Sequence, residues 1–197
     1  MLIYLSPILI PHKMRTLIAS VLAAVTMLSS SKAEQVVISE VMFHPADTRP
    51  EYIEIWNITN TPLDFAKWRF TDGITYEFPD FTSGSPQAIF LKANERIVVS
   101  SADPATTRTA YGIPAAVRIF GPWTGALDNA GELVTLKDKN GVTVTQLEYK
   151  DGGRWPKEAD GAGYSIVLRN ENNKIDDWHN WRRSQLRGGS PLSLIHI

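Results

Sequence analysis

The sequence contains no cysteine. This absence excludes a disulfide scaffold, a thiolate nucleophile and any zinc site with cysteine ligands. A folded domain must therefore be stabilised by packing, and six Trp, six Tyr and seven Phe supply the bulk for a core. Hydrophobic residues make up 43% and charged residues 21% of the chain, which is typical of a folded domain and not of a disordered one.

Motifs of catalysis are also missing. The sequence has no G-x-S-x-G nucleophile elbow, no P-loop and no dinucleotide fingerprint. It has four histidines, and His12 and His196 lie near the two ends, which leaves His44 and His179 for acid–base chemistry. We therefore expect no catalytic residue, no cofactor-binding residue and no metal ligand, and a protein that is not an enzyme.

The first 33 residues differ from the rest. Arg15 is followed by an apolar run from Leu17 to Leu28 and then by small residues, with Ser31 and Ala33 at the positions that signal peptidase prefers. This pattern predicts a signal peptide over residues 1–33, with Met14 as the true start, and hence export to the cell surface, periplasm or medium. The run is too short to cross a bilayer comfortably, so we expect no membrane span after cleavage.

The charge of the remaining chain argues against nucleic acid as a partner. Residues 34–197 contain 17 basic and 21 acidic residues, a net charge of about −4. Such a balance does not suggest a surface that follows a phosphate backbone.

The stretch EYIEIWNITNTP raises the question whether Glu51 and Glu54 form a catalytic pair. Three positions apart is one face of a helix, but in a strand the two side chains point to opposite faces. Ile53 and Ile55 alternate with other residues, most of which favour strands, and a cluster of turn-forming residues, NITNTP, follows directly. These features favour a strand, so the two carboxylates should diverge.

Short β-forming segments bounded by turn residues recur along the chain, and this pattern predicts an antiparallel β-sandwich. One short helix is expected, capped by Asp103, with Pro104 in its first turn and Gly112 at its end. Two hairpins should turn at Asp72-Gly73 and Asn140-Gly141. The remaining strands are predicted in QVVISEVMF (35–43), RIVVSS (96–101) and YSIVLRN (164–170).

The ordered set of these segments resembles a known family. VVISEVMFHP, EYIEIWN, PLDFAKWRFTDG, FGPWTGALDNAGELVTLKDKNG and RWPKEADGAGYSIVLRN follow one another as in the lamin tail domain of large exported bacterial proteins. The resemblance covers roughly residues 35–191 and implies an all-β, immunoglobulin-like sandwich with one short helix over 34–191.

The resemblance also implies a function. It suggests a non-catalytic module of an exported or cell-surface bacterial protein, with an adhesive, protein–protein or scaffold role. Its partner would be an unidentified protein or polysaccharide, together with further domains of the same chain. The alternative is an N-terminal accessory domain of a larger exported enzyme, such as a CotH-type kinase or a hydrolase.

Two positions depart from the family pattern. Lys67 stands where the family usually has glycine before Trp68, which puts a special backbone angle there in doubt. Asn94 replaces a second common glycine, in the turn before RIVVSS, and asparagine tolerates the left-handed conformation well enough to keep that turn.

Several clusters admit a functional and a structural interpretation. Glu158 and Asp160 lie in a glycine-rich loop that could hold a cation or a sugar, although Trp155 and Pro156 could simply pin this loop to the sandwich. Ser165 in GAGYS begins a predicted strand, and no base is indicated near it.

Asp176, Asp177 and His179 are too few for a metal site by themselves, so we expect them to face water. Asp138 and Asn140 before Gly141 have the look of a partial calcium loop, but a hairpin turn explains them fully.

The arginines near the C-terminus form a third cluster. Arg182, Arg183 and Arg187 with Trp178 and Trp181 have the composition of a small platform for single-stranded nucleic acid, but such arginines more often make ion pairs at a solvated edge.

The aromatic residues raise a last alternative, a carbohydrate binder with a row of exposed rings. Tyr52, Trp56, Trp123 and Trp155 are its candidates, although most of them should be core. We expect Trp68 to lie between the two sheets together with Phe70. Asn57-Ile58-Thr59 is also an acceptor sequon for glycosylation.

The last six residues, Leu192 to Ile197, are apolar where a polar linker is expected. We expect this tail to be non-native and the chain to be truncated. A genuine final strand is the alternative interpretation.

Overall fold

The computed structural model describes residues 35–80 and 90–191, all within one compact unit, Glu34–Ile197. The predicted signal peptide (1–33) and the suspected tail (192–197) lie outside the described residues. No helix in the described part of the chain is both long and apolar enough to cross a membrane.

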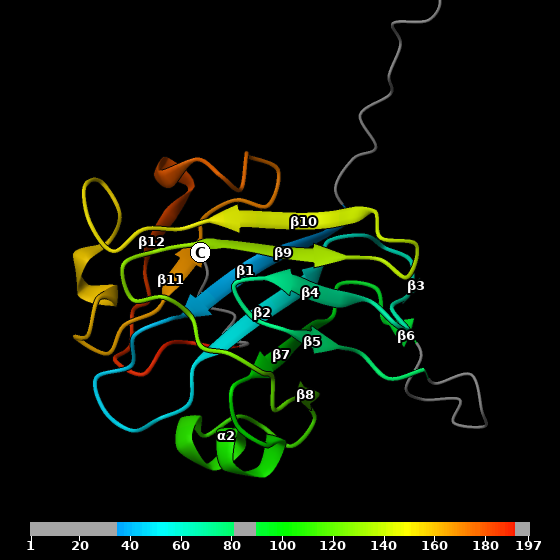
Figure 1. The fold of residues 1–197 in the computed structure, drawn as a ribbon, viewed down its shortest axis with the longest axis horizontal. Helices are drawn as coiled ribbons and strands as arrows, with labels where there is room; N and C mark the ends of the chain where they lie inside the picture. The colour runs from blue at the N-terminus through cyan, green and yellow to red at the C-terminus, as the bar shows by residue number, and fades with distance from the viewer. Residues whose placement is uncertain (1–34, 81–89, 192–197) are drawn as a thin grey trace, which may run out of the picture. The chain divides into compact units, whose positions relative to one another are not determined.

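The larger of the two main layers is a six-stranded sheet with the order β12-β11-β1-β2-β7-β8 (Figure 1). Every neighbouring pair in it is antiparallel except β7 and β8, which are parallel. The long strand β1 therefore lies beside β2 on one side and beside β11, from far along the chain, on the other. Its strands are β1 (Val36–Met42), β2 (Tyr52–Asn57), β7 (Arg96–Ser100), β8 (Ile119–Phe120), β11 (Ile166–Leu168) and β12 (Trp181–Arg183).

The second layer is a four-stranded sheet with the order β10-β9-β4-β5, whose strands β9 and β10 cross over β1 in Figure 1. A two-stranded sheet of β3 and β6 adjoins it. The strands are β3 (Leu63–Asp64), β4 (Arg69–Asp72), β5 (Tyr76–Glu77), β6 (Phe90–Leu91), β9 (Leu133–Lys137) and β10 (Thr143–Glu148). The predicted β-sandwich is confirmed, with the parallel β7–β8 pair as its departure from an antiparallel pattern.

The two predicted hairpins are present. Gly73 and Gly141 have φ angles of 78° and 83°, which a glycine adopts without steric cost. The turn after β9 is closed by the Asp138 carboxylate, which accepts hydrogen bonds from the backbone N–H groups of Asn140 and Val142 at 2.8 and 2.9 Å. Asp138, Asn140 and Gly141 therefore form a turn, as predicted.

The core lies between the two sheets and consists of apolar side chains from both. Trp68 is 8% exposed and Phe70 1% exposed, whereas Arg69 is half-buried and Lys67 exposed. The predicted place of Trp68 between the sheets is confirmed. Strands β2, β7 and β9 contribute alternate residues, because successive side chains of a strand point to opposite faces.

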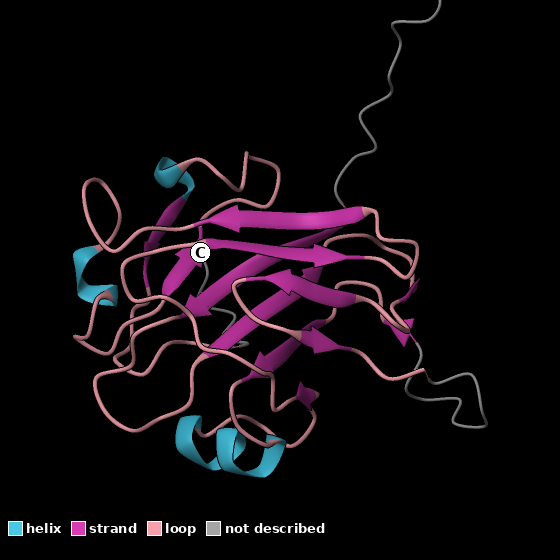
Figure 2. Cartoon of the chain, in the orientation of Figure 1, coloured by secondary structure: helices cyan, strands magenta, loops and turns pink. Residues whose placement is uncertain are grey.

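The predicted helix is α2 (Pro104–Tyr111), at the lower edge of Figure 2. The Asp103 side chain accepts hydrogen bonds from the N–H groups of Ala105 and Thr106, and Gly112 ends the helix in the left-handed conformation. A second, smaller cluster of apolar side chains lies beside this helix on the outer face of the six-stranded sheet. It contains Met42, Tyr52, Val98, Ile113 and Ile119.

Both positions that depart from the family pattern keep the left-handed backbone. Lys67 has a φ of 58° and Asn94 a φ of 57°. Asn94 therefore preserves its turn, as expected, and the doubt about Lys67 is answered: lysine adopts the special angle itself.

Four strands and two 3-10 helices, η1 (Lys157–Ala159) and η2 (Trp178–Asn180), were not predicted. The strands β3, β6, β8 and β12 are two or three residues long. A period of two cannot be recognised in so short a segment, because it needs at least four residues to repeat.

Candidate functional site

Two carboxyl side chains, those of Glu40 and Glu54, lie on opposite strand positions in the structure. The pair considered from the sequence was Glu51 and Glu54. Glu40 of β1 lies opposite Glu54 of β2, next to an irregularity in the register between Ile38 and Glu40. Both residues are 0% exposed. Alternation along β2 places Glu54 on the same outer face as Tyr52, away from Ile53 and Ile55 of the core.

One oxygen of Glu40 accepts three hydrogen bonds from distant parts of the chain. The donors to Oε1 are the Tyr52 hydroxyl at 2.5 Å, the Ser165 hydroxyl at 2.5 Å and the Ser190 backbone N–H at 2.7 Å. The other oxygen, Oε2, is buried with no hydrogen-bond partner among the described residues.

Burial in this cluster changes the acidity of Glu40. Desolvation by burial is the main cause that raises the pKa of Glu40 to about 7, and the negative charge of Glu54 adds to it. The hydrogen bonds from Ser165, Ser190 and Tyr52 lower the pKa and offset part of this rise. Near neutral pH this carboxyl therefore exists in both protonation states.

Glu54 has a cation for a partner. Its Oε1 lies 2.7 Å from Nη1 of Arg96 and accepts a hydrogen bond from the Ser39 hydroxyl at 2.6 Å. The Arg96 guanidinium in turn lies 3.8 Å from the centre of the Trp56 ring. A buried carboxylate that is both paired and hydrogen-bonded avoids most of the cost of leaving water.

The segment Gly188–Ser190, which we call the strap, covers this cluster. The strap residues are buried, and Gly189 has a φ of 80°. A Cβ at Gly189 would lie 1.9 Å from the Tyr52 hydroxyl oxygen and 2.8 Å from Glu40 Oε1, so only glycine fits. Ser165, Glu40 and Tyr52 are all 0% exposed. A hydroxyl beside a carboxyl has the form of a nucleophile and a base, but in this structure both side chains are enclosed by protein.

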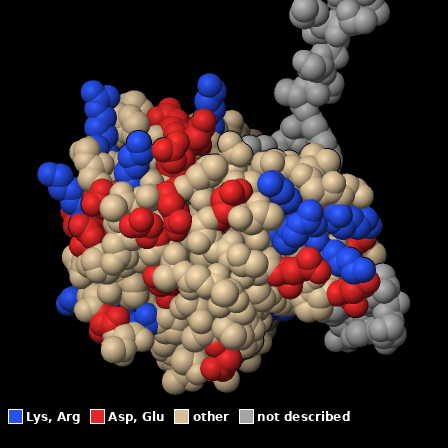
Figure 3. Space-filling view, in the orientation of Figure 1, with Lys and Arg blue, Asp and Glu red and all other residues tan. Residues whose placement is uncertain are grey.

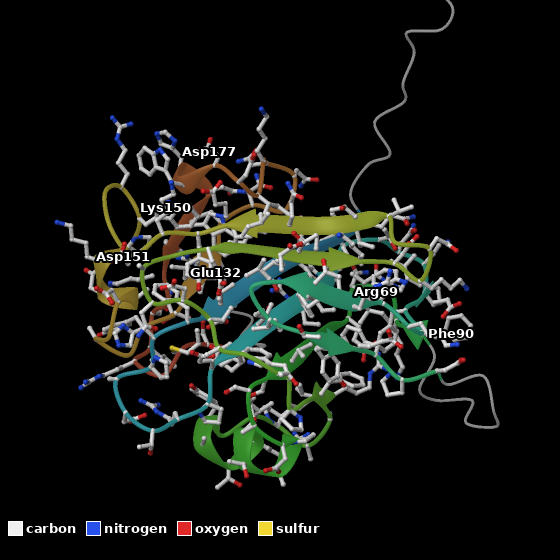
Figure 4. All side chains as sticks on the ribbon, in the orientation of Figure 1. Arg69, Phe90, Glu132, Lys150, Asp151 and Asp177 are labelled. Atoms are coloured by element: carbon white, nitrogen blue, oxygen red, sulfur yellow. The ribbon has the colours of Figure 1, made fainter. Side chains whose placement is uncertain are left out.

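A second group of polar side chains lies on the surface at the edge strand β12. Four arginines, with Trp178, line a depression of about 390 Å³ that we call the arginine groove. In Figure 4 the labelled Asp177, the residue before Trp178, lies on the opposite side of the view from Arg69. The groove is lined by Arg154, Pro156, Glu158, Arg169, Trp178, His179, Trp181, Arg182 and Arg183.

Guanidinium groups in and beside this groove lie on aromatic rings. Arg154 lies 5.2 Å from the centre of the Trp178 ring, and Arg183 lies 4.8 Å from that of Tyr164. Arg169 is oriented differently, because its Nε donates a hydrogen bond to the carbonyl of Trp181 at 3.1 Å. The Trp181 ring beneath is 3% exposed and belongs to the core.

The arginine cluster predicted from the sequence is therefore brought together in part. Arg182, Arg183, Trp178 and Trp181 line the groove, but Arg187 does not. Arg187 donates from Nε to the carbonyl of Ala162 at 3.0 Å.

Glu51 and Glu54 diverge as predicted. Glu51 Oε2 accepts a hydrogen bond from the backbone N–H of Leu127 at 3.0 Å, whereas Glu54 pairs with Arg96. Partial burial raises the pKa of Glu51. Glu51 lines a polar cavity of about 520 Å³ together with His44.

The two acids of the glycine-rich loop do not converge on one site. Asp160 Oδ1 lies 2.7 Å from His44 Nδ1, whereas Glu158 lies 3.9 Å from Arg183. Trp155 is 8% exposed and packs near Trp181 with 6.1 Å between the ring centres. The loop is therefore pinned by Trp155, which agrees with the structural interpretation.

Asp177 and His179 have a local structural role. The Asp177 carboxylate caps η2 by accepting from the His179 backbone N–H at 3.0 Å, and it lies 2.8 Å from the same residue's Nδ1. These hydrogen bonds lower the pKa of Asp177. Asp176 is exposed, and within residues 35–80 and 90–191 no three His, Asp or Glu side chains are placed to hold a metal ion.

The asparagine of the glycosylation sequon is buried. The Asn57 side chain is 0% exposed, and its Nδ2 donates to the carbonyls of Thr61, Leu91 and Lys92 at 2.9, 3.1 and 2.8 Å. The nitrogen that would carry a sugar thus joins the turn after β2 to the end of β6.

The proposed row of exposed aromatic residues is not formed. Tyr52, Trp123 and Trp155 are 0%, 6% and 8% exposed, as expected of core residues. Trp56 is half-buried beneath the Arg96 guanidinium.

Sequence reasoning missed Glu40 and gave Ser165 no partner, and the structure corrects both points. Ser165 and Glu40 are 125 positions apart in sequence, so no local pattern could join them. One signal was available: Glu40 interrupts the apolar run VVISEVM, and an acid in such a strand needs a buried partner.

The comparison with known proteins separates the N-terminal part of the domain from its C-terminal strands. The family model described as Lamin Tail Domain matches residues 29–151. A comparison with curated proteins found no match. The match ends before β11, β12 and the strap, all of which the structure joins to the matched part through β1. The two-layer sandwich agrees with the immunoglobulin-like fold of this family, and the chain therefore belongs to the lamin tail domain family.

Proposed function

We propose that this chain is a non-catalytic module of an exported protein, with an adhesive, protein-binding or scaffold role. The observation that carries the proposal is the enclosure of the Ser165–Glu40 pair. Both side chains are 0% exposed, and their hydrogen bonds tie β1 to β11 and to the strap. Side chains that could do chemistry are used here to hold the fold together.

The surface supports the binding part of the proposal. Four arginines, three of them exposed, line a groove on the edge of the sandwich, where a partner can approach from solvent. The interior beneath it is filled by buried aromatic side chains, which provide a rigid base. Rigid scaffolds of this kind usually place binding residues on their loops and edges.

The first test asks whether the purified domain turns over substrates. It is incubated with ATP and with ester, phosphoester and glycoside reporters, and we expect no product above a blank. Turnover that disappears in Ser165→Ala, His179→Ala or Asp177→Ala would overturn the proposal of a non-catalytic module.

The second test concerns export. The full chain is expressed in a secreting bacterial host, and the exported product is analysed by mass spectrometry of its N-terminal peptide. We expect the product to begin at Glu34. Retention of the whole chain in the cytoplasm with residues 14–33 intact would contradict the export part of the proposal.

A further inference from the structure

We propose that the arginine groove binds an acidic polysaccharide, whose carboxylate or sulfate groups its guanidinium groups recognise. This inference rests on the proposed binding function and names the chemical class of the partner.

The first argument is the local charge. Four arginines line the groove with one carboxylate, that of Glu158, although residues 34–197 carry more acids than bases. Glu158 lies 3.9 Å from Arg183, too far for a strong pair. Within residues 35–80 and 90–191 neither Arg154 nor Arg169 forms an ion pair with a carboxylate. The groove therefore holds cationic groups that a polyanion can neutralise.

The second argument is the support that aromatic rings give to two of the guanidinium groups. The guanidinium carbon of Arg154 lies 5.2 Å from the centre of the Trp178 ring, and that of Arg183 lies 4.8 Å from the centre of the Tyr164 ring, so both groups rest against aromatic side chains. The N–H donors lie in the plane of the group and match carboxylate and sulfate oxygens in pairs. Because these side chains are already supported, less rotamer entropy is lost when a ligand binds.

The third argument is the position of the groove. β12 is the end strand of the six-stranded sheet, and Arg182 and Arg183 belong to it. A volume of about 390 Å³ is at the lower end of the range for ligand sites, which suits a few sugar units. A longer polymer can continue along the exposed edge.

The aromatic residues favour a sugar over single-stranded nucleic acid. Nucleic-acid strands are bound by stacking of bases on exposed rings. The Trp178 ring is stacked on His179 at 3.5 Å and contacted by Arg154, and Trp181 is buried. The rings are thus occupied by protein groups, and charge is what remains for recognition.

The experiment titrates the domain, residues 34–191, with defined probes by calorimetry at low salt. The probes are a sulfated heparin oligosaccharide, a polygalacturonate oligosaccharide, neutral dextran and an oligothymidylate of similar charge. We expect at least one acidic oligosaccharide to bind, more weakly as salt is raised, and dextran not to bind.

The decisive variant is Arg154→Ala combined with Arg183→Ala, two exposed positions. We expect binding to weaken roughly tenfold or more, since charge-assisted hydrogen bonds are lost at both. The matched control is Lys67→Ala with Lys139→Ala, which removes the same charge from exposed side chains elsewhere. The control should bind within about twofold of the parent if local charge and not net charge decides. Both variants are checked for an unchanged melting temperature.

Three results would overturn the inference. They are no binding of either acidic oligosaccharide, equal weakening in the control, and tighter binding of the oligothymidylate than of both sugars. These failures are distinct from a failure of the proposed function, which substrate turnover would reveal in the separate assay.

Discussion

The two faces of the six-stranded sheet are built in different ways. The inner face meets β4, β9 and β10 through apolar side chains such as Ile53, Ile55 and Phe70. Around Glu40 the outer face holds buried polar groups that are joined by hydrogen bonds to the strap. Apolar contacts are non-directional, whereas the Glu40 cluster requires each donor at a fixed place.

The two faces should therefore respond differently to mutation and to pH. The stability that the inner face provides depends on volume and is insensitive to pH. The stability that the outer face provides depends on a titrating group and on a backbone position without a side chain. Figure 3 shows acidic and basic side chains side by side on the upper and right parts of the visible surface, whereas Glu40 and Glu54 are 0% exposed.

The largest expected effect is on the inner face, for Trp68→Ala. Truncating a buried Trp removes many contacts and leaves a cavity, so the free energy of unfolding should fall by roughly 3–5 kcal/mol. Urea unfolding followed by fluorescence measures it. Leu133→Ala is the control, since that side chain is 40% exposed and should change stability by no more than about 0.5 kcal/mol. Equal midpoints for the two variants would refute the placement of Trp68.

The second prediction concerns the pH dependence that Glu40 causes. Its folded pKa of about 7 is raised from 4.5, so the folded state keeps a proton that the unfolded chain releases at lower pH. The stabilisation is complete below about pH 4.5 and is lost as the pH rises through 7, by roughly 3 kcal/mol in total.

Glu40→Gln should remove this loss, because glutamine stays neutral while its oxygen can still accept hydrogen bonds. Its unfolding free energy, measured in urea between pH 4.5 and 8, should therefore vary less than that of the parent. Glu148→Gln, at a side chain that is 62% exposed, is the control and should follow the parent. Parallel curves for Glu40→Gln and the parent would show that Glu40 does not titrate in this range.

The smallest of the three effects is expected at the strap. Gly189→Ala would force a methyl group against the buried Tyr52 hydroxyl, and we expect a loss of roughly 1–3 kcal/mol. Gly153→Ala has the same kind of left-handed φ, 70°, but no atom within 4 Å of the added Cβ. The difference between their melting temperatures isolates the contact, and equal values would mean that the strap yields without cost.

The sequence predicted the inner face well and the outer face poorly. Alternating apolar residues and Asp-Gly or Asn-Gly turns are local signals, which is why β1, β2, β7 and both hairpins could be predicted. The Asp103 cap and Gly112 are equally local. The contacts of Glu40 with Ser165 and Ser190 join positions 125 and 150 residues apart, and no periodicity reports them.

The arginine groove could likewise be predicted only where its residues are neighbours in sequence. Trp178, Trp181, Arg182 and Arg183 were grouped because they are neighbours in sequence. Arg154 and Arg169 were missed, because the fold of the loops brings them into the groove. Asn57 matches a glycosylation sequon in the sequence, but the three hydrogen bonds of its side chain to backbone carbonyls appear only in the folded chain.

The central place of β1 has a consequence for how the chain folds. β1 can pair early with β2, since Met42 and Tyr52 are partners only ten residues apart, but its other edge waits for β11. Pairings so distant in sequence form slowly. Until then a nascent chain presents an open strand edge, which invites pairing with other chains. In that interval Ser165 and Ser190 do not yet enclose the Glu40 carboxyl, and an acid beside an open strand edge disfavours pairing with another chain. We therefore expect the carboxyl that fastens the finished sheet also to limit aggregation of the unfinished one.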